Sequence, residues 1–309
     1  MNAFAKSLLR FIPIAICIYI VLVSIWGTFV PQAFRTNMTT SSPEGNTHQR
    51  LEEVKRNKDI DILFLGSSRA FSVFDTRMYQ QQGYSVFNMG TSSQTPLQTI
   101  VLLHRYLDQL HPQHIIFEVS PLMFSSDGIE SYTDIIANDQ LDYHATLMTC
   151  QAAHINVLNT LIYKTYRTII GTAAEGKVPH SDKHRRYIEG GFVEVDIKDY
   201  QPIAHLSSAE NIQLNTIQLE AFEAIVQLIA ENGIKLTLVQ VPFIESKYQS
   251  YQSINQQFDS LIQQNGTYHN FNRTMNWSDS TYFRDEIHLN QRGIERFNKQ
   301  LMATLGLDK

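Results

Sequence analysis

Residues 59–69 of the chain read DIDILFLGSSR. The run from Asp59 to Leu65 is short and mostly apolar, which predicts a buried β-strand. Gly66 follows it directly and predicts a tight turn, because glycine adopts backbone angles that other residues avoid. Ser68 would then stand at the start of the next helix, at the carboxyl end of the strand.

The alternation of strand and helix continues along the chain. Further strands are predicted at 84–89, 114–119 and 234–241, with a short one at 268–271. Apolar residues at helical spacing predict helices at 96–110, 214–231 and 291–305. Strands that alternate with helices form parallel sheets covered on both faces. The sequence therefore predicts an α/β fold, a three-layer α/β/α sandwich with a central parallel sheet of about five strands.

Residues 125–210 interrupt this alternation. They hold a helical stretch at 145–170 and then a Gly- and charge-rich segment, so we interpret 125–210 as a mostly helical insertion over the carboxyl edge of the sheet. A basic cluster in this segment has two interpretations, a solvated loop or a site for phosphate-bearing polymer or lipid headgroups. The cluster consists of His180, Lys183, His184, Arg185 and Arg186.

The N-terminus carries an uncharged, mostly apolar run from Phe11 to Val30. A helix of about 20 such residues spans the core of a bilayer. Lys6 and Arg10 precede the run, and positive charge before a first span keeps that end in the cytoplasm. A cleaved signal peptide is the alternative, but no small-residue cleavage site follows Gly27.

These features predict the following organisation. Residues 1–10 form a cytoplasmic tail, 11–30 a single transmembrane signal anchor, 31–56 a polar linker, and 57–309 a domain in the periplasm or on the extracellular side of the cell membrane.

The composition excludes several classes of protein. The chain has 25 basic and 30 acidic residues and a formal charge of −5, whereas a general nucleic-acid binder needs a basic surface. Cys17 and Cys150 lie in unrelated contexts, so no disulfide is predicted. No metal-binding motif is present, and we expect neither a metal nor another cofactor.

Three positions carry residues suited to acyl transfer. Ser68 at a strand end can act as a nucleophile, and the N–H groups at the start of the next helix can face an oxyanion. A serine needs a base, and the base needs a carboxylate that fixes its tautomer. Asp285 and His288, three residues apart, can supply these two groups. Gly90 ends the second strand and can offer a further N–H to the oxyanion, although a plain turn is the alternative at each position.

The order of these positions resembles the SGNH (GDSL-like) hydrolase superfamily, whose fold is flavodoxin-like. The resemblance covers most of residues 57–305 and implies that Ser68 is the nucleophile, that Asp285 and His288 complete its triad, and that Ser68 and Gly90 form the oxyanion hole. The chain departs from the family at two places. Ser67 stands where the family usually has Asp, and the third strand lacks the Asn that usually completes the oxyanion hole.

Other blocks resemble one branch of that superfamily, the membrane-anchored proteins of envelope modification, including the D-alanyl-lipoteichoic acid transfer protein. They are the GSS block, the Ser-Pro-x-x-Phe after the third strand, and 282–288 (YFRDEIH).

Further side chains near these blocks are candidate substrate contacts. They are Arg69, Ser92, Ser93 and Glu118. The alternative role for Arg69 is a salt bridge. The alternative role for Glu118 is a structural hydrogen bond. Ser92, Ser93 or Gln94 can also replace the missing oxyanion donor.

Together these observations predict a membrane-anchored extracytoplasmic serine esterase or O-acyltransferase that forms an acyl-serine on a cell-envelope glycan or related polymer. A polytopic membrane acyltransferase is an expected partner, and no nucleic acid is expected. The alternative is a non-catalytic SGNH-like module that binds envelope polysaccharide or partners a membrane acyltransferase.

Overall fold

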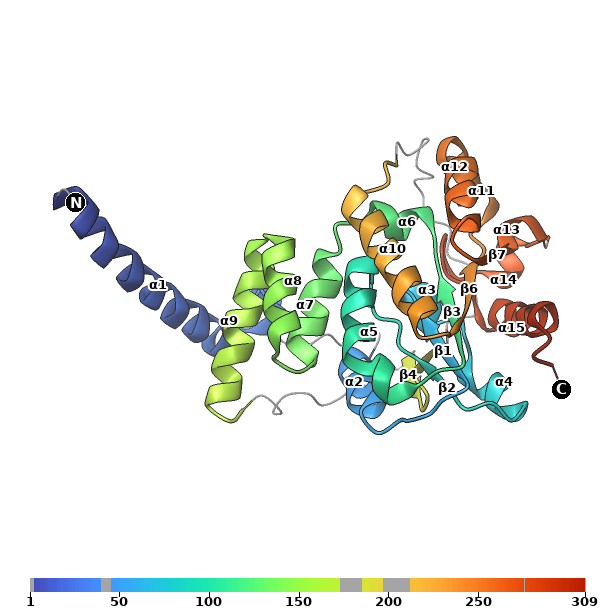
Figure 1. The fold of residues 1–309 in the computed structure, drawn as a ribbon, viewed down its shortest axis with the longest axis horizontal. Coiled ribbons are helices and arrows are strands. Elements are labelled where there is room, and N and C mark those ends of the chain that lie inside the picture. Colours follow the sequence, from blue (N-terminus) through green and yellow to red (C-terminus); the bar gives the residue numbers. More distant parts are fainter. Residues whose placement is uncertain (1–2, 40–45, 173–184, 197–211, 275, 309) are drawn as a thin grey trace. The chain divides into compact units, whose positions relative to one another are not determined.

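The computed structural model (Figure 1) describes residues 3–39, 46–172, 185–196, 212–274 and 276–308. The chain forms two compact units. Unit 1 comprises residues 1–42 and 132–178, and unit 2 comprises 43–131 and 179–309.

Unit 2 is built on a five-stranded sheet in which every pairing is parallel. The strands follow the order β2-β1-β3-β6-β7. They are β1 (Ile62–Leu65), β2 (Val86–Asn88), β3 (His114–Glu118), β6 (Lys235–Gln240) and β7 (Thr267–Asn270). This arrangement confirms the predicted parallel sheet, and each strand falls within or next to its predicted segment.

Side chains of the central strands alternate between two covered faces. In β1, Ile62 and Phe64 point to one face, and Leu63 and Leu65 point to the other. All four are buried, as expected for a parallel sheet with helices on both sides.

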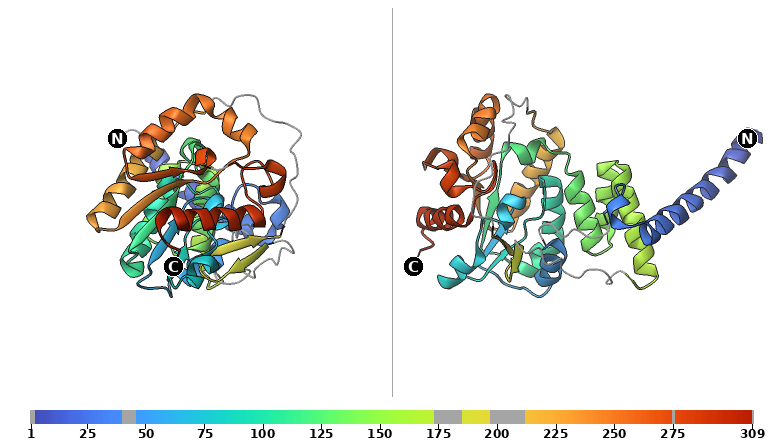
Figure 2. Two further views of the ribbon diagram at one scale, coloured as in Figure 1. Left: turned by 90° about the vertical axis from the view of Figure 1, so that its right-hand side faces the viewer. Right: turned by 180° about the vertical axis from the view of Figure 1, so that it is seen from behind.

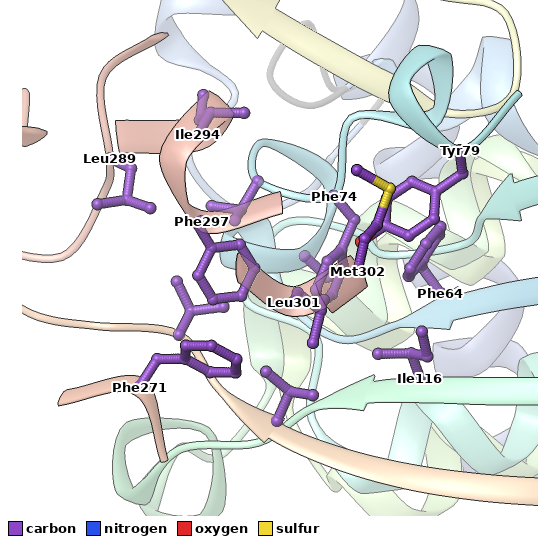
Figure 3. Packing of buried hydrophobic residues seen from close by; sticks show 14 of the residues in the cluster. Phe64, Phe74, Tyr79, Ile116, Phe271, Leu289, Ile294, Phe297, Leu301 and Met302 are labelled. Atoms are coloured by element: carbon purple, nitrogen blue, oxygen red, sulfur yellow. The ribbon is translucent and has the colours of Figure 1, made fainter. Parts of the chain in front are cut away.

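Different helices cover the two faces. On one face lie α5 (Pro96–Leu110) and α10 (Thr216–Glu231), where Phe222 packs against Phe117 of β3. On the other face lies α15 (Gln291–Leu305), drawn in dark red in Figure 2. Figure 3 shows Phe297 and Leu301 of α15 in one cluster with Phe64 and Ile116. These layers confirm the predicted α/β/α sandwich.

Shorter helices connect and flank these layers. They are α3 (Ser68–Phe71), α4 (Thr76–Gln81), α6 (Pro121–Ser125), α11 (Glu245–Ser250), α12 (Gln252–Gln263), α13 (Phe271–Thr274) and α14 (Asp279–Tyr282).

Helix α2 (Thr47–Val54) lies inside the segment predicted to be a linker, 31–56. It is part of unit 2, and its Arg50 and Leu51 are fully buried. Arg50 donates to the carbonyl oxygen of Gly191 at 2.9 Å, which ties α2 to the hairpin formed by β4 (Arg185–Ile188) and β5 (Phe192–Val195). The prediction of a polar linker is therefore corrected for residues 47–54, because a buried cation and leucine hold this helix in the folded unit.

The predicted insertion, 125–210, contains helices followed by the hairpin. The helices are α7 (Ile129–Asn138), α8 (Tyr143–Ala152) and α9 (Ile155–Ile169). The single helical stretch expected at 145–170 is divided because Ala153 adopts a left-handed conformation (φ 45°) and His154 caps α9. His180, Lys183 and His184 of the basic cluster lie outside the described residues.

Unit 1 contains α1 (Ala3–Phe29), a short 3-10 turn η1 (Gln32–Phe34), most of α7, and α8 and α9. The segment Phe4–Phe29 is long and apolar enough to span a membrane, a property that signal sequences share. Tyr163 of α9 packs with Val23 of α1, and a Cβ at Gly27 would lie 2.4 Å from the Tyr163 ring. Gly27 therefore allows α9 to approach α1 closely.

Candidate active site

The turn after β1 presents Ser68 at the carboxyl edge of the sheet. Gly66 has a φ of 139°, and a Cβ on it would lie 2.8 Å from Cβ of Glu118, so both the backbone angle and the space require glycine. Ser67 caps α3 by accepting a hydrogen bond from the Arg69 N–H. Ser68 is therefore the first residue of a helix that points its N-terminus at the strand ends, where parallel α/β sheets bind ligands.

Ser67, Arg69 and Glu118 form a buried polar group behind this turn. The Ser67 hydroxyl donates to Oε2 of Glu118 at 3.1 Å, and Nη1 of Arg69 lies 3.5 Å from Oε1 of the same carboxylate. Arg69 also donates to the carbonyl oxygens of Val241 and Pro242.

Arg69 and Glu118 are 1% and 0% exposed. Their burial favours the structural alternatives over the predicted substrate contacts. At position 67 a serine hydroxyl meets a carboxylate supplied by β3.

The Asp285-x-x-His288 segment forms a tight turn between α14 and α15. The N–H groups of Ile287 and His288 donate to Oδ1 of Asp285 at 2.9 and 2.8 Å. A bridge between Phe283 and Leu289 closes the turn at its base. The short sequence spacing therefore fixes the carboxylate and the imidazole relative to each other.

The structure brings the three predicted triad side chains together. Oγ of Ser68 lies 3.0 Å from Nε2 of His288, across 220 positions of sequence. Nδ1 of His288 lies 2.9 Å from Oδ2 of Asp285 and 3.0 Å from Oδ1. An ionised carboxylate only accepts hydrogen bonds, so it places the imidazole proton on Nδ1 and leaves Nε2 to accept the Ser68 proton.

The surroundings set the charges of Asp285 and His288. Burial alone acts to raise the pKa of Asp285, but the hydrogen bond and charge of His288, the Ile287 N–H and Arg284 outweigh it and lower this pKa to about 2. Burial lowers the pKa of His288; the hydrogen bond to Asp285 opposes this, and the charge of Arg284 adds to it. At neutral pH the pair is therefore an ionised carboxylate and a neutral imidazole.

Gly90 lies against the Ser68 turn, but its N–H is engaged. A Cβ on Gly90 would lie 3.0 Å from the carbonyl oxygens of both Gly66 and Ser67, so this close approach requires glycine. Its N–H donates to Oδ1 of Asn88 at 3.1 Å, in an Asx-type turn. The role of Gly90 as oxyanion donor stays a prediction, which requires that its N–H leave Asn88 before it binds an oxyanion.

Ser92 and Ser93 continue this loop beside Ser68. Ser93 has a φ of 49°, which is uncommon for a residue other than glycine, and its hydroxyl donates to Glu130 at 2.6 Å. Both serines line a pocket together with Ser68. Gln94 is committed elsewhere, since its amide donates to the Thr99 hydroxyl at 2.8 Å. The Ser93 hydroxyl and the Gln94 amide are thus both engaged, and the replacement of the expected oxyanion donor by Ser92, Ser93 or Gln94 stays a prediction.

Two pockets meet at Ser68, and both are also lined by Ser93 and Ile287. Pocket A, of about 170 Å³, has an apolar wall formed by Leu122, Met123 and Ile287.

Pocket B, of about 280 Å³, is more polar and includes His288. The hairpin and the triad turn give it two cations, Arg185 and Arg284. Val193 and Val195 of the hairpin also line it.

Sequence reasoning missed Arg284 as a pocket residue, although it stands directly before Asp285. Of the basic cluster, only Arg185 and Arg186 are described. Arg185 lines pocket B, whereas Arg186 is 68% exposed and forms an ion pair with Glu194 at 2.9 Å. The exposure of Arg186 agrees with the solvated-loop interpretation, and the phosphate-site interpretation stays a prediction for Arg185.

Comparisons with known proteins add likenesses of structure. Neither a protein-family model nor a curated protein sequence matches the chain. Solved structures that resemble it include a GDSL-like lipase from Bacteroides thetaiotaomicron VPI-5482, with 11% identity and a TM-score of 0.44 over 85% of this chain and 98% of that one. A protein proposed to be an acylhydrolase from Bacteroides fragilis NCTC 9343 has 14% identity and a TM-score of 0.42 over 85% and 98% of the two chains.

A third structure, of a protein proposed to be a platelet activating factor from Streptococcus pneumonia, has 13% identity and a TM-score of 0.43 over 99% and 100% of the two chains. Values this low do not transfer an activity, so the functional assignment depends on the side chains around Ser68.

Proposed function

We propose that the chain is a serine esterase or O-acyltransferase of the SGNH type. The observation that carries this proposal is the chain of contacts from the Ser68 hydroxyl through the His288 imidazole to the Asp285 carboxylate. A serine hydroxyl becomes a nucleophile when a neutral base accepts its proton and a carboxylate stabilises the resulting imidazolium.

In the first half-reaction, Oγ of Ser68 attacks the ester carbonyl carbon and Nε2 of His288 takes the hydroxyl proton. The bond to the alcohol then breaks, and His288 returns the proton to the departing alcohol. The product is an acyl-serine. In the second half-reaction, water or a glycan hydroxyl attacks this ester with His288 as base, and the proton finally returns to Oγ of Ser68. Asp285 stays ionised throughout.

The Ser68 N–H is the first donor to the oxyanion. It is at the first position of α3, where a helix leaves its N–H groups unpaired, and it has no hydrogen-bond partner among the described residues. The Gly90 N–H becomes the second donor if Asn88 releases it.

Pocket A is suited to the acyl group because of its apolar wall of Leu122, Met123 and Ile287. A volume of about 170 Å³ gives room for a short acyl chain. Pocket B then receives the alcohol or acceptor, for which we propose a glycan or related polymer of the cell envelope.

Labelling with a fluorophosphonate probe tests the proposal, because the probe reacts only with an activated serine. We expect the wild-type chain to be labelled and the Ser68→Ala variant to be silent. Ser253→Ala, which changes an exposed serine of α12, is the matched control and should label like the wild type. A folded wild-type chain that does not label would contradict the assignment.

The pH dependence of catalysis should follow the imidazole. We expect kcat/KM to rise with pH through one apparent pKa below 6.5, the ordinary value for histidine, and then to level off. His288 must be neutral to accept the Ser68 proton, so activity is lost as the pH falls through this pKa. A pH–rate profile with its midpoint near 8, obtained where circular dichroism shows a folded chain, would be inconsistent with His288 as base.

We further propose that α1 anchors the chain in the cell membrane with the remainder facing outward, as Lys6 and Arg10 predict. The protein should then stay with membranes after a high-salt wash, and a reporter fused to the C-terminus should be active outside the cytoplasm. A polytopic membrane acyltransferase is a suitable partner for such an anchored chain. Recovery of a soluble protein that lacks residues 1–27 would support a cleaved signal peptide instead.

One observation favours a second candidate, a non-catalytic module that binds envelope polysaccharide or partners a membrane acyltransferase. The oxyanion hole has lost the Asn of the third block, and the Gly90 N–H is bonded to Asn88. Loss of one oxyanion donor costs about 10²–10³ in rate. Under this alternative, the probe would not label Ser68, and glycan binding would survive the Ser68→Ala change.

A further inference from the structure

Arg284 is a buried cation with an unsatisfied end. Its side chain is only 9% exposed, and Nη1 is buried with no hydrogen-bond partner among the described residues. Among the described residues, Nε of Arg284 pairs with Oδ2 of Asp285 at 3.7 Å. Burying a guanidinium nitrogen without an acceptor is costly, so this end of the side chain is suited to an anion that the chain itself does not supply.

The environment of Arg284 carries further positive charge. Arg185 of β4 lines pocket B together with Arg284. Burial lowers the pKa of Arg284 to about 10; Asp285 opposes this effect and the charge of Arg185 adds to it. The Arg284 guanidinium is therefore charged at neutral pH, and it would attract an anion that enters pocket B.

Two carboxylates of the described residues lie in or beside pocket B. Asp285 is bonded to His288, and Glu130, which also lines pocket B, accepts the Ser93 hydroxyl. The contact with Asp285 uses Nε of Arg284 and leaves Nη1 without a partner among the described residues, in a side chain that lines pocket B.

We propose that Arg284, assisted by Arg185, binds an anionic group of the substrate in pocket B, so that the enzyme selects esters or acceptors that carry a phosphate or carboxylate. Guanidinium groups bind such anions through paired hydrogen bonds, which also fix their orientation. This inference rests on the proposed function, because the bound anion would hold the ester carbonyl beside Ser68 and His288.

Binding of inorganic phosphate tests the subsite without turnover. The full-length chain in detergent is titrated with sodium phosphate, and a parallel titration with sodium chloride at equal ionic strength is the reference. The difference between the two shifts in Tm gives the apparent affinity for phosphate. We expect Arg284→Met to weaken phosphate binding by about tenfold or more, because it removes hydrogen bonds to a charged group. Arg186→Met is the matched control on β4, since Arg186 is exposed and lies outside the lining of pocket B.

Phosphate binding that is equal in the wild type and Arg284→Met would overturn the proposal, as would a phosphate effect no larger than that of chloride. If circular dichroism shows that Arg284→Met does not fold, Arg185→Met carries the same comparison, because Arg185 is half-exposed on the hairpin.

Kinetics then identify the anion. An acetylated sugar is compared with its phosphorylated counterpart and with the corresponding acetylated uronic acid. We expect the ratio of kcat/KM for the preferred anionic ester over the neutral ester to fall about tenfold in Arg284→Met and to be unchanged in Arg186→Met.

A ratio that is the same in wild type and Arg284→Met would argue against the subsite even if Ser68 is catalytic. Phosphate binding that depends on Arg284 in a chain without esterase activity would refute the proposed function and leave the anion site standing.

Discussion

The Ser68→Ala variant should lose about 10⁴-fold or more of kcat/KM toward an ester substrate while its fold stays intact. The hydroxyl group is the nucleophile in the proposed mechanism, and its Oγ lies 3.0 Å from Nε2 of His288. Alanine removes only the oxygen at a half-buried position, so the stability should change little. Steady-state kinetics and circular dichroism measure the two properties.

The His288→Ala variant should show a similar loss of kcat/KM. The kcat/KM of the Ser68→Ala/His288→Ala double variant should be little lower than that of either single variant. Residues that act as one unit give strongly non-additive losses. Ser253→Ala should keep the wild-type rate. Independent, multiplying losses in the double variant would show that Ser68 and His288 do not act in the same step, and the triad assignment would then be wrong.

The sequence predicted the sheet well because its strands are buried on both faces and its helices carry clear boundary residues. Helix α5 begins at Pro96 after the capping residue Thr95, and α15 ends before Gly306, which has a φ of 64°. Such signals are local. The break at Ala153 has no local signal, because alanine favours helices, and tertiary packing decides its left-handed conformation.

The meeting of Ser68, His288 and Asp285 was predictable from the order of motifs, but pocket B was not. Its cations come from the hairpin and from the triad turn, about 100 positions apart, and no periodicity relates them. The engagement of Gly90 could have been anticipated, since Asn-x-Gly is typical of an Asx turn in which the side-chain oxygen accepts the N–H two residues on.

Glu118→Ala should lower the free energy of unfolding by about 3–5 kcal/mol, because it leaves the buried charge of Arg69 without its carboxylate. Burial already lowers the pKa of Arg69, and the charge of Glu118 is the largest effect that opposes it. The change also removes the acceptor of the Ser67 hydroxyl and so loosens the turn that carries Ser68. Urea denaturation followed by circular dichroism measures the loss.

Two further variants separate the buried ion pair from a general effect of removing a carboxylate. Glu220→Ala, on the exposed face of α10, should stay within about 0.5 kcal/mol of the wild type. Arg69→Met/Glu118→Leu removes both charges together and should recover most of the loss, because apolar residues of similar volume replace buried ion pairs at little cost. If the midpoint of urea unfolding is the same in Glu118→Ala as in the wild type, the carboxylate does not hold the Ser68 turn. Glu118 would then again be a candidate contact for the substrate.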